Sequence, residues 1–223
     1  MKVWNWEGFW SYFTNLYLLE GALWTVGLTL STLVLGGLIG LLLALMRLSR
    51  HKALSRLAQG YVWIFRGTPL LVQLIIIYTG LPQLGLVRFT VLESAVLGLA
   101  LNEAAYLSEI LRGGILSVAK GQTEAARALG LRPFQIFRLV VLPQALRVII
   151  PPMTSQYLNL TKNSSLAVAI GYQDIVSIAN TMLNQTGQAI EGIALIMLVF
   201  LTISLSISLL MNWYNARTAL VSR

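Results

Sequence analysis

The feature that most constrains this chain is a run of 26 residues without a charge, residues 21–46, which lies between Glu20 and Arg47. About 20 apolar residues in a helix cross the roughly 30 Å hydrocarbon core of a bilayer, so this run predicts a membrane-spanning helix. Residues 192–216 form a second long uncharged run. The composition agrees, because 57% of the residues are hydrophobic and only 11% are charged, whereas soluble domains contain about 25% charged residues. We therefore predict an all-α polytopic membrane protein.

Three less uniform apolar segments bring the predicted number of membrane spans to five. Residues 57–78 contain Gly67 and Pro69, so we expect a helix with a break at which backbone groups are freed. Residues 92–116 carry two glutamates, and residues 148–170 are the least hydrophobic of the set. The predicted organisation is a single transmembrane domain over residues 1–223, with spans at 21–46, 57–78, 92–116, 148–170 and 192–216.

The positions of the basic residues predict the orientation, because loops on the cytoplasmic side of a membrane are enriched in Lys and Arg. Twelve of the sixteen basic residues lie in the first loop, the third loop and the C-terminus: Arg47, Arg50, Lys52, Arg56, Arg112, Lys120, Arg127, Arg132, Arg138, Arg147, Arg217 and Arg223. Only Lys2 and Arg88 lie in segments of the opposite side. We expect the N-terminus outside and the C-terminus in the cytoplasm. This bias explains the net charge of +8, so nucleic acid is not expected as a partner.

The N-terminal segment, residues 1–20, is expected to form a helix that lies in the outer interface of the bilayer. Its large side chains recur at intervals of three and four, which places them on one helical face: Val3, Trp6, Trp10, Phe13 and Tyr17. The segment lacks the basic start and apolar core of a cleavable signal peptide. Anchoring without a further function is the favoured interpretation.

Several classes of chemistry are excluded by composition. The chain has no cysteine and a single histidine, His51, so disulfides, thiolate chemistry and Cys/His metal sites are not available, and a Ser-His-Asp triad has almost nothing to draw on. No glycine is followed directly by a lysine, so the phosphate-binding loop of nucleotide hydrolases is also absent from the sequence.

The third loop, residues 120–143, carries the most specific pattern in the chain. Residues 124–129 are good helix formers, Gly130 is suited to end a helix, and Pro133 is suited to the first turn of another. The pattern predicts a short helix, a tight turn and a second helix on the cytoplasmic side. Small alanine side chains on the first helix would let a partner approach the backbone closely.

The spacing in this loop resembles the signature loop of permease subunits of bacterial ATP-binding-cassette importers. It reads Glu-Ala-Ala, three residues, Gly, nine residues, an aliphatic residue, one residue and Leu-Pro. The resemblance implies a coupling helix that docks into a separate ATP-binding subunit, with four residues as the contact: Glu124, Ala125, Ala126 and Gly130. It also implies that ATP and Mg belong to that subunit, and that this chain binds no cofactor.

Three further segments resemble the polar amino acid permeases of the same superfamily: residues 66–73, 102–106 and 162–166. Five spans with an outside N-terminus are also typical of that family. The resemblance implies a bacterial inner-membrane importer that works by alternating access. Its partners would be ATP-binding-cassette ATPase subunits, a second permease that is identical or homologous, and an extracytoplasmic amino-acid-binding protein.

Charged residues within or near the spans are candidates for the substrate site, because a charge at the centre of a membrane helix costs about 2.5 to 3.5 kcal/mol. Both signs occur, as an amino acid zwitterion would require. Acidic side chains would bind the ammonium group, basic ones the carboxylate, and amides would add hydrogen bonds; the candidates are Arg66, Asn102, Glu103, Lys162, Asn163 and Asp174.

Structural alternatives remain open for several of these candidates. Arg66 can instead satisfy carbonyl groups that the helix break frees, and Glu109 is expected to form a structural ion pair near the cytoplasmic end. Lys162 and Asp174 are too far apart along one straight helix, about 18 Å, to pair directly. Either the two charges have different partners or the chain folds back near Gly171; we expect the fold-back, which would bring Asp174 towards a central cavity.

The predicted function is therefore a permease subunit that moves amino acids, with a dimer expected because the polar third and fourth spans need a partner other than lipid. One alternative is an oligomeric channel or structural membrane subunit without ATP coupling, which gives the cytoplasmic motif no purpose. Another is an intramembrane enzyme that uses Glu103, Glu109 or Asp174 as acid or base. The identity of the amino acid is open.

Overall fold

The computed structural model describes residues 4–187 and 189–218, and within these ranges all regular elements are helices, which confirms the predicted all-α class. The elements follow in this order: α1 (Trp6–Phe13), α2 (Leu16–Leu48), α3 (Lys52–Gly67), α4 (Leu70–Ile75), a π-helical turn η1 (Ile76–Gly80), α5 (Leu81–Gln83), α6 (Val91–Leu116), α7 (Lys120–Ala128), α8 (Pro133–Ile136), a π-helical turn η2 (Phe137–Val141), α9 (Leu142–Asn163), a 3₁₀ segment η3 (Ser164–Ile170), α10 (Ile175–Thr186) and α11 (Ala189–Thr218).

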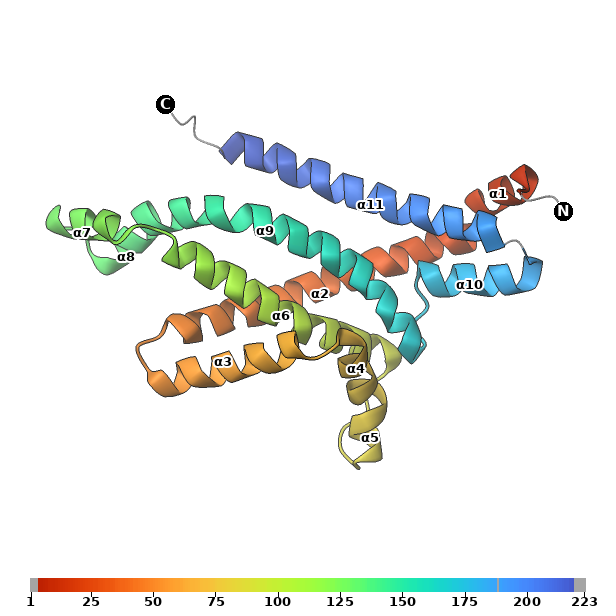
Figure 1. The fold of residues 1–223 in the computed structure, drawn as a ribbon, viewed down its shortest axis with the longest axis horizontal. Helices are drawn as coiled ribbons and strands as arrows, with labels where there is room; N and C mark the ends of the chain where they lie inside the picture. The colour runs from red at the N-terminus through yellow and green to blue at the C-terminus, as the bar shows by residue number, and fades with distance from the viewer. Residues whose placement is uncertain (1–3, 188, 219–223) are drawn as a thin grey trace.

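Four long helices, α2, α6, α9 and α11, run along the length of the molecule, and α4 and α5 project from its side (Figure 1). Helices α1 and α10 lie at one end. The turn between α2 and α3, the α7–α8 loop and the C-terminal end of α11 lie at the opposite end. The three segments that carry most of the basic residues therefore share one end of the bundle, as a common side of the membrane would require.

Three of the described helices are long and apolar enough to cross a membrane: Leu16–Leu48, Pro133–Ile170 and Ile190–Trp213. The pair Lys52–Gly67 and Leu70–Gln83 passes the same test as one broken span with a bend of 105°, which makes up to four. Helix α6 packs at the centre of these helices but is too polar to be counted with them. The break near Pro69 is therefore confirmed, whereas five spans stays a prediction.

Close packing between α2 and α6 forms the centre of the bundle. A Cβ atom placed on Gly36 would lie 3.1 Å from the carbonyl oxygen of Ala100, and one on Gly40 would lie 3.1 Å from that of Ala104. Two glycines one helical turn apart allow membrane helices to approach closely, since helix association in lipid depends on van der Waals packing. Helix α2 starts five residues before the predicted span, at Leu16, and its glycines explain why it packs along so much of its length.

Helix α1 divides its aromatic residues between two faces. Phe9 and Tyr12 are buried in a cluster with Ile175 and Leu195, which anchors α1 to α10 and α11. Trp6, Trp10 and Phe13 of the predicted aromatic face are exposed, and Val3 lies outside the described residues. Tyr17 is exposed too but belongs to α2, so the predicted single helix over residues 1–20 is corrected to two helices with a break between Phe13 and Leu16. The buried Glu191 carboxylate accepts a hydrogen bond from the Asn5 backbone N–H at 2.6 Å and fixes the start of this segment.

Candidate functional site

Two buried amide side chains, Gln73 and Asn102, form hydrogen bonds to backbone carbonyl groups at the break between α3 and α4. The Gln73 Nε2 group donates to the carbonyl oxygens of Phe65 at 2.9 Å and Thr68 at 3.2 Å. Asn102 Nδ2 donates to the same Phe65 oxygen and to Gln73 Oε1, each at 3.0 Å. These bonds satisfy carbonyls that the break frees, which would otherwise be costly in a membrane. Asn102, a predicted ligand, thus has both amide hydrogens engaged within the chain.

Arg66 is not one of the residues that hydrogen-bond the carbonyl groups at the break. Its guanidinium lies over the Tyr106 ring, 5.0 Å from the ring centroid, in a cation–π contact between α3 and α6. The side chain is exposed, and the ion pairs of the described residues do not include it. The alternative in which Arg66 satisfies freed carbonyls is therefore wrong, because the amides do so, and its charge is accessible to a ligand.

Glu103 lies inside the protomer, at the contact of α2, α6 and α9. It is 2% exposed, and its Oε2 atom accepts a hydrogen bond from Gln156 Nε2 at 2.8 Å. Its Oε1 atom has no hydrogen-bond partner among the described residues. Gly36 of α2 lies against its side chain. In this conformation the carboxyl group links two helices, and a substrate can reach it only if they separate.

The second glutamate of α6, Glu109, forms the ion pair that its position near the basic end predicted. Its carboxylate pairs with Arg112 at 3.0 Å and also with Arg47 at the end of α2. One carboxylate between two guanidinium groups holds the ends of α2 and α6 together. Because these three charges pair with one another, none of them is free for a zwitterionic ligand.

Among the six predicted ligands, Lys162 is the one that lines a groove. It is exposed and lines a groove of about 730 Å³ between α1, α9 and α11, whose other lining residues are almost all apolar: Trp4, Trp6, Phe9, Ala194, Met197, Leu198, Phe200, Leu201 and Ser204. The described lining contains no acidic group. Asn163, the last residue of α9, is half-buried beside it. An anionic group is the ligand chemistry that this groove suits, since Lys162 supplies its one charge.

Asp174 follows the turn that the sequence predicted at Gly171, whose φ of +89° lies in the left-handed region. The turn is confirmed, and α10 then packs against α2. Asp174 is fully buried at the N-terminus of α10, where its Oδ1 atom accepts a hydrogen bond from the Ser177 N–H at 2.9 Å. No ion pair with Lys162 is present among the described residues. The carboxylate caps a helix and does not line the groove of Lys162.

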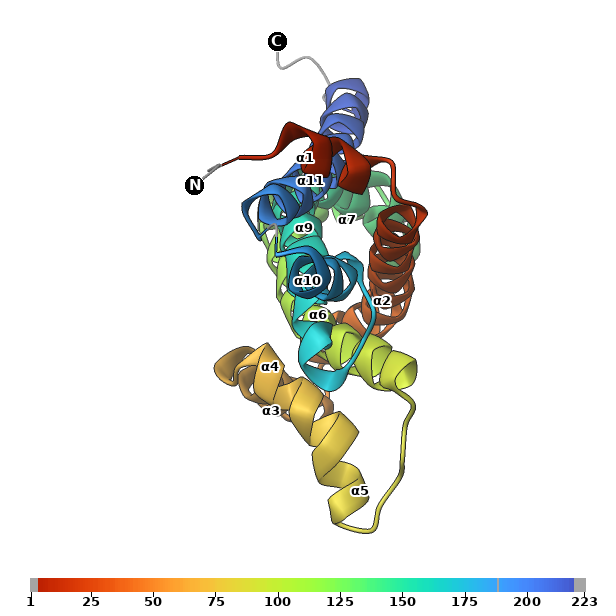
Figure 2. The ribbon, with the colours of Figure 1, turned by 90° about the vertical axis from the view of Figure 1, so that its right-hand side faces the viewer.

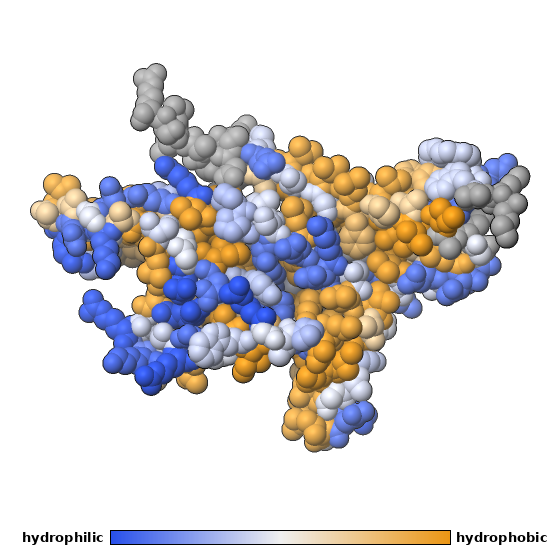
Figure 3. Space-filling model, viewed as in Figure 1, coloured by the Kyte–Doolittle hydropathy of each residue, from blue (hydrophilic) through white to orange (hydrophobic). Residues whose placement is uncertain are grey.

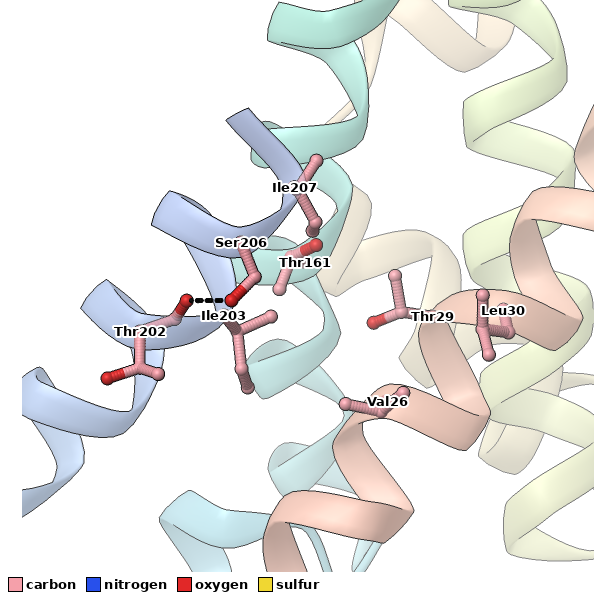
Figure 4. A pocket seen from close by; sticks show the side chains of 8 residues that line it. All are labelled: Val26, Thr29, Leu30, Thr161, Thr202, Ile203, Ser206 and Ile207. Carbon is pink, nitrogen blue, oxygen red and sulfur yellow. Dashed lines mark hydrogen bonds between the residues drawn. The ribbon is translucent and has the colours of Figure 1, made fainter. Parts of the chain in front are cut away.

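A second cavity, of about 350 Å³, lies between α2, α9 and α11 (Figure 4). Its polar atoms are hydroxyl groups that donate to carbonyls of their own helices, as Ser206 does to Thr202 at 2.8 Å and Thr29 to Thr25 at 2.8 Å. The remaining lining is aliphatic: Val26, Leu30, Ile203 and Ile207. With no charged group in its described lining, this cavity is poorly suited to a zwitterion.

The motif of residues 120–143 adopts the predicted helix, turn and helix at the basic end of the bundle (Figure 1). Helix α7 ends before Gly130, whose φ of +80° is a left-handed conformation that favours glycine. Glu124 and Ala125 are exposed, as a docking surface needs. Ala126, however, is only 5% exposed and packs against Ile136 of the following helix. The expectation that a partner approaches Ala126 is therefore corrected, because α8 and η2 already cover that face.

Two residues of this loop that sequence reasoning missed are large and apolar. Leu129 is 81% exposed and Phe134 is 71% exposed, on either side of the turn at Gly130. The signal was present in the sequence, since a loop of basic and small residues has little reason to contain a leucine and a phenylalanine beside its turn. Gln73 was missed as well, although a glutamine four residues after Pro69 is well placed to bond carbonyls freed there.

The six predicted ligands thus lie in separate places within one protomer. Asn102 bonds the helix break, and Arg66 lies over Tyr106 near the end of α3. Glu103 lies between α6 and α9, Lys162 and Asn163 lie at the end of α9, and Asp174 precedes α10. The accessible charges among them are the two cations. The two carboxylates are enclosed by helices of the same chain.

Comparisons with known proteins agree with this architecture. The family model for the binding-protein-dependent transport system inner membrane component matches residues 36–220. The chain is 59% identical over 130 residues to the general L-amino acid transport system permease protein AapQ of Rhizobium johnstonii, covering 58% of this chain and 32% of that protein. It is 40% identical over 171 residues to the putative glutamine transport system permease protein GlnP of Rickettsia bellii, covering 77% and 78%. The match spans about a third of AapQ.

Solved structures show the same fold. An amino acid ABC transporter crystallised with histidines has a chain that is 34% identical, with a TM-score of 0.88 over 97% of this chain and 100% of that one. A chain of the MetNI methionine ABC transporter shares the fold, with a TM-score of 0.71 at 22% identity over 91% and 96%. Because the family model covers most of its length, the chain belongs to the family of inner membrane components of binding-protein-dependent transport systems, which are multi-pass membrane proteins.

Proposed function

We propose that this chain is the permease subunit of an ATP-driven importer that moves amino acids into the cytoplasm by alternating access. The substrate class is supported by the names of relatives such as AapQ and GlnP. The ATPase is a separate polypeptide, and a second permease and an extracytoplasmic binding protein complete the importer. The N-terminus lies outside and the C-terminus in the cytoplasm.

The observation that carries this proposal is the α7–α8 loop. It extends beyond the long helices at the basic end of the bundle (Figure 1), and Leu129 and Phe134 leave two large apolar side chains exposed there. Apolar anchors beside small residues are suited to a groove in a partner protein. A channel or structural subunit that works without ATP has no use for such a surface at this place. We assign it to the ATPase, with Glu124, Ala125 and Gly130 shaping the contact.

The accessible cations suggest how the substrate is bound. Lys162 in its groove, with Asn163 beside it, is positioned to bind the substrate carboxylate, and Arg66 offers a second cationic group at the helix break. Asn102, Glu103 and Asp174 act indirectly: Asn102 bonds the break after α3, Glu103 joins α6 to α9, and Asp174 caps α10. The substrate ammonium group then needs an acceptor from the second permease, or from Glu103 in a state in which α6 and α9 have moved apart.

Purification of the chain from its native membranes tests the main proposal. An ATPase subunit should co-purify in stoichiometric amount, and the complex in proteoliposomes should take up amino acids only when ATP is present. Transport without ATP by the isolated chain would instead support a channel. Turnover of a substrate by the isolated chain would support an intramembrane enzyme.

The coupling surface is tested by a pair of variants in the same loop. Leu129→Asp should lower substrate-stimulated ATP hydrolysis about tenfold or more, since losing an apolar anchor at an interface costs about 2 kcal/mol. Gln122→Asp, at an exposed position on α7, adds the same charge and serves as the control. Equal ATPase coupling in both variants would exclude Leu129 from the contact.

The substrate site is tested by comparing Lys162→Met with Glu103→Gln. Loss of a charged group that holds a desolvated ligand costs about 2 to 5 kcal/mol, so Lys162→Met should weaken apparent substrate affinity about 30-fold or more. Glu103→Gln keeps the shape of the side chain and should change affinity only severalfold. A larger loss of substrate affinity in Glu103→Gln than in Lys162→Met would instead place the ligand contact at Glu103, between α6 and α9.

A further inference from the structure

The turn between α2 and α3 carries a dense group of cations in a part of the chain that has no acidic residue. Between Glu20 and Glu93 the sequence contains no Asp or Glu. Around the turn it places the cations Arg47, Arg50, Lys52 and Arg56, together with His51. The structure provides a counter-charge for one of them, since Arg47 pairs with Glu109 of α6.

The other three cations, which we call the basic turn, are Arg50, Lys52 and Arg56. All three are exposed, and the ion pairs of the described residues include none of them. Lys52 and Arg56 are four residues apart on α3, so their side chains lie on the same face of the helix. Three unneutralised charges in seven residues create a local positive potential that attracts an anion.

Apolar side chains adjoin the basic turn on both helices. Leu45 near the end of α2, and Leu54 and Leu57 on the first turns of α3, are exposed. Figure 3 shows the hydrophilic surface at this end of the bundle, beside apolar surface on the same helices. Leu54 and Leu57 lie around α3 from the face of Lys52 and Arg56, so the start of this helix presents a charged side for a lipid head group and apolar sides for hydrocarbon chains.

We propose that the basic turn binds an anionic phospholipid of the cytoplasmic leaflet, with the phosphate between Arg50, Lys52 and Arg56 and the acyl chains along the exposed leucines. An acidic protein surface would satisfy the charges but leave the leucines beside them without a partner. The leaflet assignment rests on the proposed orientation of the chain, whereas the lipid chemistry rests on the residues themselves.

The test uses the full chain, purified in detergent with the subunits that co-purify, and phosphatidylglycerol as the probe. Native mass spectrometry counts the lipids that stay bound during a titration, with phosphatidylcholine as the neutral reference. The wild type should prefer phosphatidylglycerol, and the preference should weaken as salt rises. Each basic residue near a membrane surface contributes about 1 kcal/mol, so Arg50→Gln/Arg56→Gln should bind phosphatidylglycerol about 30-fold more weakly.

A matched double variant controls for net charge. Arg138→Gln/Arg147→Gln removes two exposed arginines elsewhere at the same end of the bundle, and should leave the affinity for phosphatidylglycerol within threefold of the wild type. Equal losses in the two double variants would overturn a local site, as would binding of both lipids alike. A third outcome is that Arg50→Gln/Arg56→Gln loses a co-purifying protein while its lipid binding is unchanged. That result would overturn the lipid site and show that the basic turn contacts a protein.

This test does not depend on the outcome for transport. In detergent the lipid reaches both ends of the molecule, so lipid binding is measured whichever way the chain is inserted. Orientation is tested separately by labelling Gln122→Cys in intact cells with an impermeant thiol reagent. Labelling there would overturn the proposed topology and the leaflet, while a retained preference for phosphatidylglycerol would leave the basic turn as the lipid site.

Discussion

Helices α2 and α11 are both long and apolar, but they differ in how much of each is buried in the structure. Both contain long apolar runs that predict a membrane span, yet 39% of the residues in the most apolar part of α2 are buried and only 6% of those in α11. Helix α2 packs along α6, whereas α11 lies at the edge of the bundle (Figure 2), in contact with α1, α9 and α10. An uncharged run therefore predicts insertion into the membrane but says little about which helices pack inside the protein.

The difference follows from small residues. Gly36 and Gly40 let the α2 backbone approach Ala100 and Ala104 of α6 to within van der Waals contact. The middle of α11 instead presents large side chains to its surroundings, among them Leu205 and Leu209. In lipid a leucine gains little by leaving the hydrocarbon for another helix, so α11 has no comparable reason to be enclosed.

Among substitutions that test this contrast, Gly36→Leu should have a large effect on stability. The new side chain would meet the Ala100 carbonyl and the Glu103 side chain, so we expect it to lower the free energy of unfolding by about 3 kcal/mol through overpacking. Thermal unfolding of the permease in detergent, followed by circular dichroism, measures the change.

The neighbouring glycine provides the control. A Cβ atom on Gly37 would have no atom within 4 Å, so Gly37→Leu should be neutral or slightly stabilising, because leucine favours the helix more than glycine does. Similar destabilisation by both substitutions would show that α2 and α6 do not meet through Gly36.

A smaller effect is expected from the amide pair, which connects the α3–α4 break to α6. Gln73→Leu should leave the Thr68 carbonyl without its partner and lower the free energy of unfolding by about 2 kcal/mol. The exposed Gln83, on α5, is the matched control, and Gln83→Leu should change stability by less than about 0.5 kcal/mol.

A double-mutant cycle with Asn102→Leu sharpens this prediction. The two side chains share a direct hydrogen bond, so their effects should be coupled by about 1 kcal/mol. Additive effects would mean that the two amides stabilise the break independently, and that the bond between them contributes nothing.

The smallest effect is expected on the open face of α11. Leu205→Ala should change the stability of the monomer by no more than about 0.5 kcal/mol, because the leucine is 52% exposed. The buried Leu99 of α6 is the comparison, and Leu99→Ala should cost about 2 to 5 kcal/mol. If Leu205→Ala instead lowers the dimer fraction in light scattering, a second permease covers this face and the contrast between α2 and α11 holds only for one protomer.

Local chemistry made some features of the site predictable. The left-handed turn at Gly130, the break before Pro69 and the fold-back at Gly171 each depend on a residue whose backbone preferences are strong. The pairing of Glu109 was likewise predictable, since Arg112 is three residues away on the same helix. The direction in which a side chain points could not be predicted from its neighbours in the sequence. Ala126 shows this, because it packs against Ile136 of its own loop.

The sequence by itself determined that this chain is helical and membrane-embedded and that residues 120–143 form a helix, a turn and a helix, because hydropathy and turn residues act over a few residues or one span. Only the tertiary structure decided which polar groups form hydrogen bonds inside the protein. Glu103 meets Gln156, 53 positions away, and Asn102 meets Gln73 and the Phe65 carbonyl, while Lys162 lies exposed in a groove. A buried hydrogen bond depends on how distant helices pack, and that packing is decided by the shapes of all the side chains together.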